Sequence, residues 1–265
     1  MDNIISVQKT VLITGASSGI GREMARLLAP TAKTLILVAR REERLRELEQ
    51  ELSGKTDILI KACDLTDRVS VDQLLTEIPP VEILINNAGM GDLELFEQAE
   101  WTKLEKMIEI NITSLTYLTR RLVGPMVKNG RGGILNVSSG YGLTVAPLAA
   151  AYGGTKHYVS AFTDALRIEL SGTGVLVSQL CPGPVETEFL EVAGNPTGRP
   201  IPGFVQISAE KCARAGLVGL ARGKAIIIPG FVMGILINLG RITPRPILRL
   251  AYSWIGKTFR KSSSS

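Results

Sequence analysis

The stretch Thr10-Val11-Leu12-Ile13-Thr14-Gly15-Ala16-Ser17-Ser18-Gly19-Ile20-Gly21 decides the fold of this chain. Its first five residues form a short, mostly apolar run that predicts a buried strand, and residues 20–29 are typical of a helix. The glycines between them lack Cβ atoms, so the turn can be tight and a pyrophosphate can approach the free N–H groups of the helix. The G-x-x-x-G-x-G spacing therefore predicts nucleotide binding, although a turn of this kind can also be purely structural.

The same alternation of strand and helix continues along the chain. We expect further strands over residues 34–39, 57–62, 82–86, 134–137, 175–180 and 225–228, with helices between most of them. Alternating strands and helices form βαβ units with right-handed crossovers. The sequence therefore predicts an α/β fold: a single-domain, Rossmann-like, doubly wound parallel sheet of about seven strands, with helices on both faces. The ligand crevice should lie at the carboxyl ends of the strands.

Composition limits the classes of protein that fit. With 265 residues, 45% of them hydrophobic and 21% charged, the chain suits one large soluble domain. Cys63, Cys181 and Cys212 lie far apart and His157 is the only histidine, so we expect neither a disulfide framework nor a metal site. The N-terminus has no basic, apolar leader pattern, which favours a cytoplasmic location. We expect no nucleic-acid partner.

Further motifs follow the glycine turn in a fixed order. They are Asn86-Asn87-Ala88-Gly89, then Asn111, then Ser139, and finally Tyr152 with Lys156. Together with the glycine turn they resemble the short-chain dehydrogenase/reductase family over almost the whole chain. The resemblance implies hydride transfer between a nicotinamide cofactor and an alcohol or a carbonyl.

The resemblance also implies which residues bind the cofactor. In the glycine turn these are Gly15, Ser17, Ser18, Gly19, Ile20 and Gly21. Ala39 stands where an acid would select NAD, and it is followed by Arg40 and Arg41. A guanidinium pairs well with phosphate, so we expect Arg40 to bind the 2′-phosphate of NADP(H). Arg41 either assists it or simply begins a charged helix.

Three later segments complete the implied cofactor site. Asp64 and Leu65 would contact adenine. Asn87, Ala88 and Gly89 would flank the ribose, while Asn86 stabilises the sheet. In the segment Pro182–Thr187, Val185 and Thr187 would hold the nicotinamide carboxamide.

The chemistry is expected at Tyr152 and Lys156, which lie four residues apart on one face of a helix. A nearby ammonium group lowers the pKa of a phenol, and such a tyrosine can protonate a developing alkoxide. In the family, the lysine also holds the nicotinamide ribose. The resemblance further implies that Ser139 orients the substrate oxygen. It also implies that Asn111, which we expect to open a helix, anchors a water that relays protons.

Two neighbouring residues are weaker candidates for this chemistry. Ser138 is one residue out of place relative to Tyr152. His157 should point about 100° away from Lys156 around the helix, which favours a structural role.

Gly153 and Gly154, which follow Tyr152, depart from the usual family pattern. They could leave room for a bulky substrate or a close neighbour, or be tolerated by a well-packed helix.

The C-terminal part of the chain has an unusual charge. All 25 Asp and Glu lie at or before Glu210, whereas residues 211–265 hold ten Lys or Arg and no acid. Such a split indicates either an anionic partner or a basic rim on a soluble enzyme. We divide the chain into a domain over 1–230, with a substrate lid near 186–207, and a basic, apolar extension over 231–265.

The extension contains two apolar runs, over 231–239 and 247–259, which are too short to span a membrane. The second places Trp254 and Ile255 in an apolar stripe. Apolar residues mixed with purely basic ones suit a helix lying on a membrane surface, so peripheral membrane contact is one interpretation. The alternative is that these segments cover the substrate cleft or a subunit interface.

The sequence therefore predicts an NADP(H)-dependent oxidoreductase that interconverts a carbonyl and a secondary alcohol, with a hydrophobic or lipid-like substrate. A homodimer or homotetramer is expected, because family members pair the two helices that here carry Leu115, Leu118 and Leu122 and Tyr158 to Glu169. The alternatives are a nucleotide-sensing protein without catalysis and a membrane-peripheral protein on the same fold.

Overall fold

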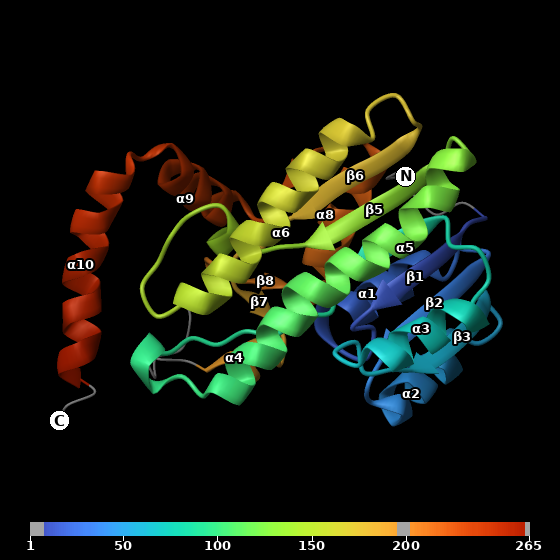
Figure 1. Ribbon diagram of the computed structural model, residues 1–265, viewed down its shortest axis with the longest axis horizontal. Coiled ribbons are helices and arrows are strands. Elements are labelled where there is room, and N and C mark those ends of the chain that lie inside the picture. Colours follow the sequence, from blue (N-terminus) through green and yellow to red (C-terminus); the bar gives the residue numbers. More distant parts are fainter. Residues whose placement is uncertain (1–7, 195–201, 263–265) are drawn as a thin grey trace.

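The computed structural model describes residues 8–194 and 202–262, and its centre is a seven-stranded parallel sheet. The strand order is β3-β2-β1-β4-β5-β6-β9, which confirms the predicted doubly wound sheet (Figure 1). The strands are β1 (Thr10–Thr14), β2 (Thr34–Ala39), β3 (Asp57–Ala62), β4 (Ile83–Asn86), β5 (Gly132–Val137), β6 (Val175–Leu180) and β9 (Ile226–Ile227). The order reverses between β1 and β4, and a ligand crevice lies at such a switch point.

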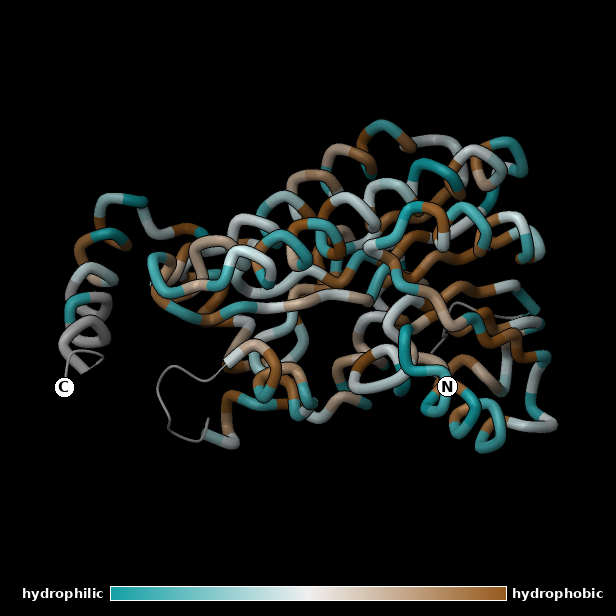
Figure 2. The backbone as a smooth tube through the Cα atoms, turned by 60° about the horizontal axis from the view of Figure 1, so that its bottom comes forward, coloured by the Kyte–Doolittle hydropathy of each residue, from teal (hydrophilic) through white to brown (hydrophobic). Residues whose placement is uncertain are grey.

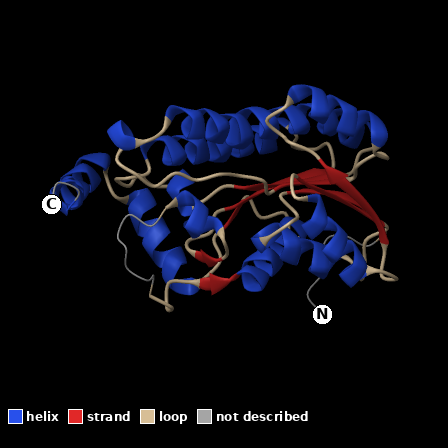
Figure 3. Cartoon of the chain, turned by 90° about the horizontal axis from the view of Figure 1, so that it is seen from below, coloured by secondary structure: helices blue, strands red, loops and turns tan. Residues whose placement is uncertain are grey.

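Helices cover both faces of the sheet (Figure 3). On one face lie α1 (Gly19–Leu28), α2 (Glu42–Leu52) and α8 (Ala209–Ala221), whose apolar side chains share a core cluster with the strands. On the other face lie α3 (Arg68–Glu77), α5 (Leu115–Lys128) and α6 (Ala150–Glu169). The sheet is therefore buried on both sides, as its apolar strand sequences predict.

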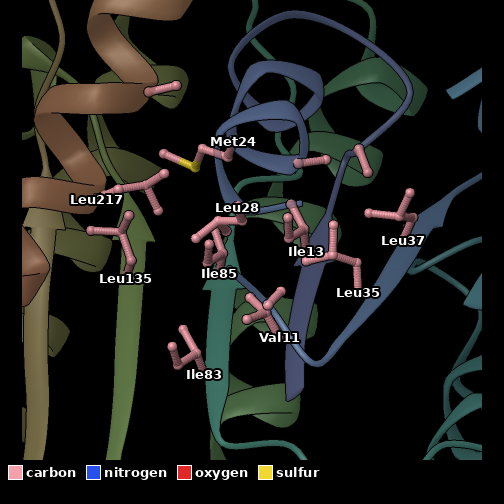
Figure 4. Close-up of a cluster of buried hydrophobic side chains, with 14 of the residues drawn as sticks. Val11, Ile13, Met24, Leu28, Leu35, Leu37, Ile83, Ile85, Leu135 and Leu217 are labelled. Carbon is pink, nitrogen blue, oxygen red and sulfur yellow. The ribbon is translucent and has the colours of Figure 1, made fainter. Parts of the chain in front are cut away.

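The two cores divide the side chains of β1 between them. Val11 and Ile13 enter the cluster beneath α1, and Leu12 enters the opposite one. Figure 4 shows Val11 and Ile13 beside Leu35 of β2 and Leu28 of α1. Each fully buried aliphatic side chain stabilises the fold by about 1.5–3 kcal/mol. This packing fixes β1 in the middle of the sheet, with the glycine turn at its carboxyl end.

The expected lid contains a second, smaller sheet that the sequence did not predict. Strands β7 (Val185–Glu186) and β8 (Ile207–Ser208) pair in parallel, and helix α7 (Phe189–Ala193) lies between them in the chain. Strands of two residues carry no readable period, which is why they escaped prediction. Residues 195–201 of the lid lie outside the described part of the chain.

Helix α4 (Trp101–Ile108) runs into a π-helical turn, η2 (Glu109–Ser114), and then into α5 without a break. The expectation that Asn111 opens a helix is therefore wrong, because this residue lies within the π-helical turn. Such turns are rare and occur often at functional sites. Here the turn lies in the helix that brings Asn111 to α6.

The C-terminal extension forms helices α9 (Phe231–Ile242) and α10 (Arg245–Ser262). Helix α9 lies against the body of the protein, whereas α10 extends away from it in both Figure 1 and Figure 2. No helix within residues 8–194 and 202–262 is long and apolar enough to cross a membrane. The side chains of Trp254 and Ile255, which we expected in the apolar stripe, lie outside the described ones.

Candidate active site

The residues that the sequence singled out gather at one edge of the sheet. The glycine turn follows β1, Arg40 and Arg41 follow β2, and Asp64 follows β3. Farther along the sheet, the segments that begin at Asn87, Ser138 and Cys181 follow β4, β5 and β6. Since all these strands are parallel, their carboxyl ends meet at the same edge.

The glycine turn is held by the segment after β4. Thr14 Oγ1 accepts hydrogen bonds from the backbone N–H groups of Asn87 and Ala88, both at 3.0 Å. Asn87 Nδ2 donates to the carbonyl oxygens of Thr14 and Gly15, at 3.0 and 3.1 Å. Gly15 has a φ of +67°, and a Cβ at Gly21 would lie 2.4 Å from the Gly15 oxygen. The side chain of Asn87 therefore shapes the turn, and glycine is required at both positions.

The N-terminus of α1 suits an anion. Its N-cap residue, Ser18, makes no side-chain capping hydrogen bond, and its first turn contains no acid. Helix N-termini carry a partial positive charge, which favours phosphate groups. The guanidinium of Arg41 adds a full charge nearby, because its Nη2 lies 3.0 Å from Ser18 Oγ and 3.3 Å from Ser17 Oγ. These residues fit the phosphates of a dinucleotide.

The two arginines after β2 differ in position. Arg40 has an exposed side chain, whereas Arg41 reaches the serines of the glycine turn and also Glu188 of the lid. From the sequence, Arg41 could either assist Arg40 in binding the phosphate or simply begin a charged helix. Its contacts favour a part in the cofactor site.

Local contacts hold the remaining cofactor candidates in place. Asp64 is exposed and its Oδ1 accepts from the backbone and hydroxyl of Thr66, at 2.9 and 2.8 Å, while Leu65 is buried. Val185 is buried at the start of β7. The hydroxyl of Thr187 lies 3.3 Å from the backbone nitrogen of Phe189, which donates to it.

Tyr152 is buried in an apolar setting. Its ring lies 5.8 Å from that of Tyr141, edge to face, and 5.7 Å from that of Phe189. Burial raises the pKa of the Tyr152 phenol above its usual value, and the hydrogen bond with the Ser139 side chain opposes this rise only in part. Burial dominates in the polypeptide by itself, and the lowering of this pKa by Lys156 stays a prediction. Tyr152 consequently stays protonated at neutral pH, the form in which a phenol can donate a proton.

Lys156 lies beside Tyr152 but bonds elsewhere. Its Nζ is 5.9 Å from the Tyr152 ring centre and donates to the carbonyl oxygen of Val137 at 2.9 Å. Burial lowers the pKa of this amine to about 8. A Cβ at Gly89 would lie 3.4 Å from Nζ and 3.1 Å from Asn111 Oδ1, so these two side chains meet beside Gly89.

Asn111 is fixed by three hydrogen bonds from the π-helical turn. Its Oδ1 accepts from the backbone N–H of Met90 at 2.9 Å, and its Nδ2 donates to the Met90 oxygen at 2.8 Å. A third bond, at 3.0 Å, runs from Nδ2 to Thr155 Oγ1. Thr155 in turn donates to the Tyr152 carbonyl oxygen at 2.7 Å. Thr155 therefore joins the π-helical turn to α6, a role that the sequence analysis missed.

The competing candidates prove to be structural. Ser138 is buried and its hydroxyl bonds the Lys156 carbonyl oxygen and the Ser160 hydroxyl, at 3.1 and 2.8 Å. His157 places Nδ1 2.9 Å from the Gly153 carbonyl oxygen of its own helix. Within the described chain no group of three acidic, histidine or cysteine side chains could hold a metal ion.

Asn86 behaves as expected. Its Nδ2 donates to Thr119 Oγ1 at 3.0 Å and to Asn136 Oδ1 at 2.9 Å, all inside the protein. These bonds join β4, β5 and α5 beneath the site.

Comparison with known proteins agrees with this arrangement. The short chain dehydrogenase family matches residues 9–196. Sulfoacetaldehyde reductase 2 of Chromohalobacter salexigens is 39% identical over 191 residues, which cover 68% of this chain and 73% of the relative.

Solved structures agree over a longer stretch. A short-chain dehydrogenase from Sphingobium yanoikuyae in complex with NADPH superposes with a TM-score of 0.77 at 32% identity, covering 89% of this chain and 97% of that one. A bulky-bulky ketone specific alcohol dehydrogenase from Comamonas testosteroni gives 0.75 at 26% identity, with 91% and 96% covered. The chain therefore belongs to the short-chain dehydrogenase/reductase family of oxidoreductases.

Proposed function

We propose that this chain is an NADP(H)-dependent oxidoreductase that interconverts a carbonyl group and a secondary alcohol. The observation that carries the proposal is the environment of Tyr152, whose phenol is buried, stays protonated and interacts with Ser139. A protonated phenol in a water-poor pocket suits the protonation of a developing alkoxide.

Each side chain then has a role in the reaction. NADP(H), when bound, supplies or accepts the hydride. Tyr152 gives its phenolic proton to the substrate oxygen during reduction and receives it during oxidation. Ser139 orients that oxygen through its hydroxyl. Lys156 contributes charge and binds the cofactor ribose, and Asn111, held by Met90 and Thr155, keeps the proton path beside Lys156 in place.

The choice of NADP(H) rests on the residues after β2. Ala39 cannot repel a 2′-phosphate, and two arginines follow it. The NADPH complex of the Sphingobium relative supports the same cofactor. We assign the phosphate to Arg40 with Arg41 and the N-terminus of α1. Asp64 and Leu65 would contact adenine, Gly89 with its neighbours the ribose, and Val185 with Thr187 the carboxamide.

A hydrophobic substrate fits the side chains around Tyr152. That residue belongs to an apolar cluster with Leu104, Met107, Ala149 and, more exposed, Met90, Leu93, Tyr141 and Phe189. Helix α9 adds an apolar cover, because Cβ atoms at Gly140 and Gly183 would lie 2.8 Å from Ile237 Cδ1 and 2.7 Å from Met233 Cγ. The Comamonas relative, which is specific for bulky ketones, is consistent with this choice.

The proposal is tested by turnover of a carbonyl panel, from short aldehydes through acyl thioesters to sterols, with NADPH and NADH compared. We expect reduction of bulky, apolar ketones with NADPH preferred. A protein that binds NADPH and reduces no member of the panel would favour the rival class, a nucleotide sensor without catalysis.

A second proposal concerns the C-terminal helices, which we assign to an anionic membrane surface. Helix α9 buries Ile237 against the body, but its other side exposes Phe231 by 84% and Ile242 by 76%. On α10, Leu250 is 76% exposed, and Arg245 and Arg249 of the same helix are exposed as well. Helix α9 is apolar on nearly all sides, and an exposed helix of this kind needs a partner. No acidic residue follows Glu210, so the charged residues of α9 and α10 are all basic. A surface of anionic lipid therefore complements both the apolar and the charged residues of these two helices.

We also propose assembly into a homodimer or homotetramer, but through other residues than the leucines of α5 that the sequence analysis named. Leu115 and Leu118 are both buried within the subunit, Leu118 in its core, so they cannot form the interface for which the sequence analysis used them. Tyr158 is exposed on α6 and stacks on the half-buried Phe162 with ring centres 5.9 Å apart. A Cβ at Gly154 would meet nothing within 4 Å, so the subunit itself does not require this glycine.

A further inference from the structure

The carboxylate of Glu188 joins the substrate lid to the start of α2. Glu188 is the N-cap residue of lid helix α7. Its Oε2 lies 3.1 Å from Arg41 Nη1, and its Oε1 lies 2.6 Å from Arg44 Nη1. The two arginines precede Glu188 by 147 and 144 residues, so the contact depends on how the lid is folded.

One guanidinium connects three segments at this point. While Nη1 of Arg41 bonds Glu188, its Nη2 bonds Ser17 and Ser18 of the glycine turn. The lid also touches the turn directly, because a Cβ at Gly19 would lie 2.9 Å from Thr187 Cγ2. Arg41 therefore stands between the lid and the residues proposed to bind the cofactor phosphates.

The charges at this point leave room for a further anion. Two arginines, Arg41 and Arg44, face one carboxylate, so the formal charges of these three groups sum to +1. Arg40, next to Arg41 in the chain, adds another positive charge. The Arg41 and Glu188 side chains are 45% and 43% exposed. Ion pairs this exposed are weak and exchange readily for other partners. A phosphate is the stronger competitor, since it carries up to two negative charges and three acceptor oxygens.

We propose that Glu188 is a specificity-determining residue that shares Arg41 with the 2′-phosphate of the cofactor, so that phosphate binding and lid position are coupled. The inference rests on the proposed NADP(H) site and deepens it. When phosphate oxygens take the N–H groups of Arg41, the lid loses one of its two ionic contacts with α2. The lid segment that begins at Val185 is then freer to move toward the nicotinamide end of the site.

The test uses ligands that lack nicotinamide, so that the lid can respond only through the adenosine end. Adenosine 2′,5′-bisphosphate carries the 2′-phosphate and 5′-AMP does not. Binding is measured by calorimetry, and lid motion by amide hydrogen exchange of residues 185–194. The variant is Glu188→Gln, which keeps the shape and removes the charge. The matched control is Glu191→Gln, an equal change of charge at an exposed residue of the same helix.

We expect the bisphosphate, and not 5′-AMP, to speed exchange of the lid amides in the wild type and in Glu191→Gln. In Glu188→Gln the lid should exchange fast with or without ligand. This variant should also bind the bisphosphate about three- to tenfold more tightly, because one repelling charge nearby is gone.

Two results would overturn the inference in different ways. If the wild type binds the bisphosphate no better than 5′-AMP, the 2′-phosphate assignment fails and the coupling with it. If the wild type prefers the bisphosphate but Glu188→Gln and Glu191→Gln behave alike in both measurements, the NADP(H) site stands and only the role of Glu188 is wrong.

Discussion

Lys156 donates a 2.9 Å hydrogen bond from Nζ to the main-chain carbonyl oxygen of Val137, the last residue of β5. Both residues are buried. A carbonyl oxygen carries only a partial charge, so it offsets only part of the cost of taking an ammonium group out of water. Burial accordingly lowers the pKa of Lys156 from 10.5 to about 8. Its charge therefore changes at a pH where surface lysines remain cationic.

The stability of the protein should depend on pH through this amine. Between about pH 8 and 10.5 the unfolded chain keeps a proton on Lys156 that the folded protein has lost, so the free energy of unfolding rises with pH. We expect the contribution of Lys156 to rise by about 2 kcal/mol from pH 7.5 to 9.5. Urea unfolding of the wild type and of Lys156→Met at both pH values measures it. A difference between the two proteins that is independent of pH would contradict a buried, titrating amine.

Catalysis should depend on the phenol of Tyr152. Tyr152→Phe removes the proton donor but keeps the ring that packs between Tyr141 and Phe189. We expect turnover to fall by at least ~10²-fold, the low end of a general-acid contribution, while NADPH still binds. Steady-state rates and a fluorescence titration with NADPH separate the two effects. Near-normal turnover would mean that the proton comes from another group.

Cofactor choice should depend on Arg40. Arg40→Asp replaces a phosphate partner by a repelling charge, so NADPH should weaken by roughly 10- to 100-fold more than NADH, given about 1.5–3 kcal/mol for a charge-assisted hydrogen bond. The control is Arg46→Asp, an equal change at an exposed position of α2 that pairs with Glu42. Dissociation constants for both cofactors provide the measurement. Equal affinity of the wild type for NADPH and NADH would refute the assignment.

The sequence predicted the fold because the strands of a parallel sheet are buried on both faces. Val11, Leu12 and Ile13 therefore form one unbroken apolar run whose members enter two different cores. The site was predictable for a related reason. The glycine turn, Arg40 and Asn87 follow directly after strands, so their meeting at one edge required only the order of the chain. The glycine turn and the Tyr152–Lys156 pair needed no knowledge of distant contacts.

What the sequence could not predict depends on burial or on contacts across the fold. The sequence suggested a lowered pKa for Tyr152 through Lys156, but burial of the phenol, which the sequence does not reveal, raises that pKa. The π-helical turn at Asn111 buries the polar residues Asn111 and Ser114, and the sequence analysis did not predict it. Leu115 and Leu118 form a stripe that would suit an interface or the interior, and only the tertiary structure shows that both are buried within the subunit.

Assembly should depend on the outward face of α6. Tyr158 and the 75% exposed Ile168 are apolar positions that a partner subunit would cover. We expect the wild type to be a dimer or tetramer at micromolar concentration, and Tyr158→Asp with Ile168→Asp to be a folded monomer, because a buried unpaired charge is costly. Light scattering measures the mass. Val69→Asp, at a 74% exposed position of α3, should leave it unchanged. A monomeric wild type would end the proposal.

Membrane contact should depend on α10 and its basic residues. Deletion after Thr243 removes α10 but keeps α9, whose Ile237 is packed against Gly140. Anionic lipid attracts about 1 kcal/mol per nearby basic residue, so Arg245→Glu with Arg249→Glu should weaken binding to vesicles of phosphatidylcholine and phosphatidylglycerol at least tenfold. The deletion should weaken it further, and salt should weaken it in the wild type. Lys55→Glu with Lys128→Glu is the control, and it should have little effect. It makes the same change of charge in the loop before β3 and at the end of α5, away from the carboxyl edge of the sheet.

The bound fraction is measured by co-sedimentation, with pure phosphatidylcholine vesicles as the background. If the shortened protein no longer binds vesicles but reduces a hydrophobic ketone at full rate, α10 is a membrane contact only. If it still binds NADPH but has lost that activity, α10 is part of the substrate site. Equal binding of the wild type to both kinds of vesicle would refute the assignment to an anionic surface.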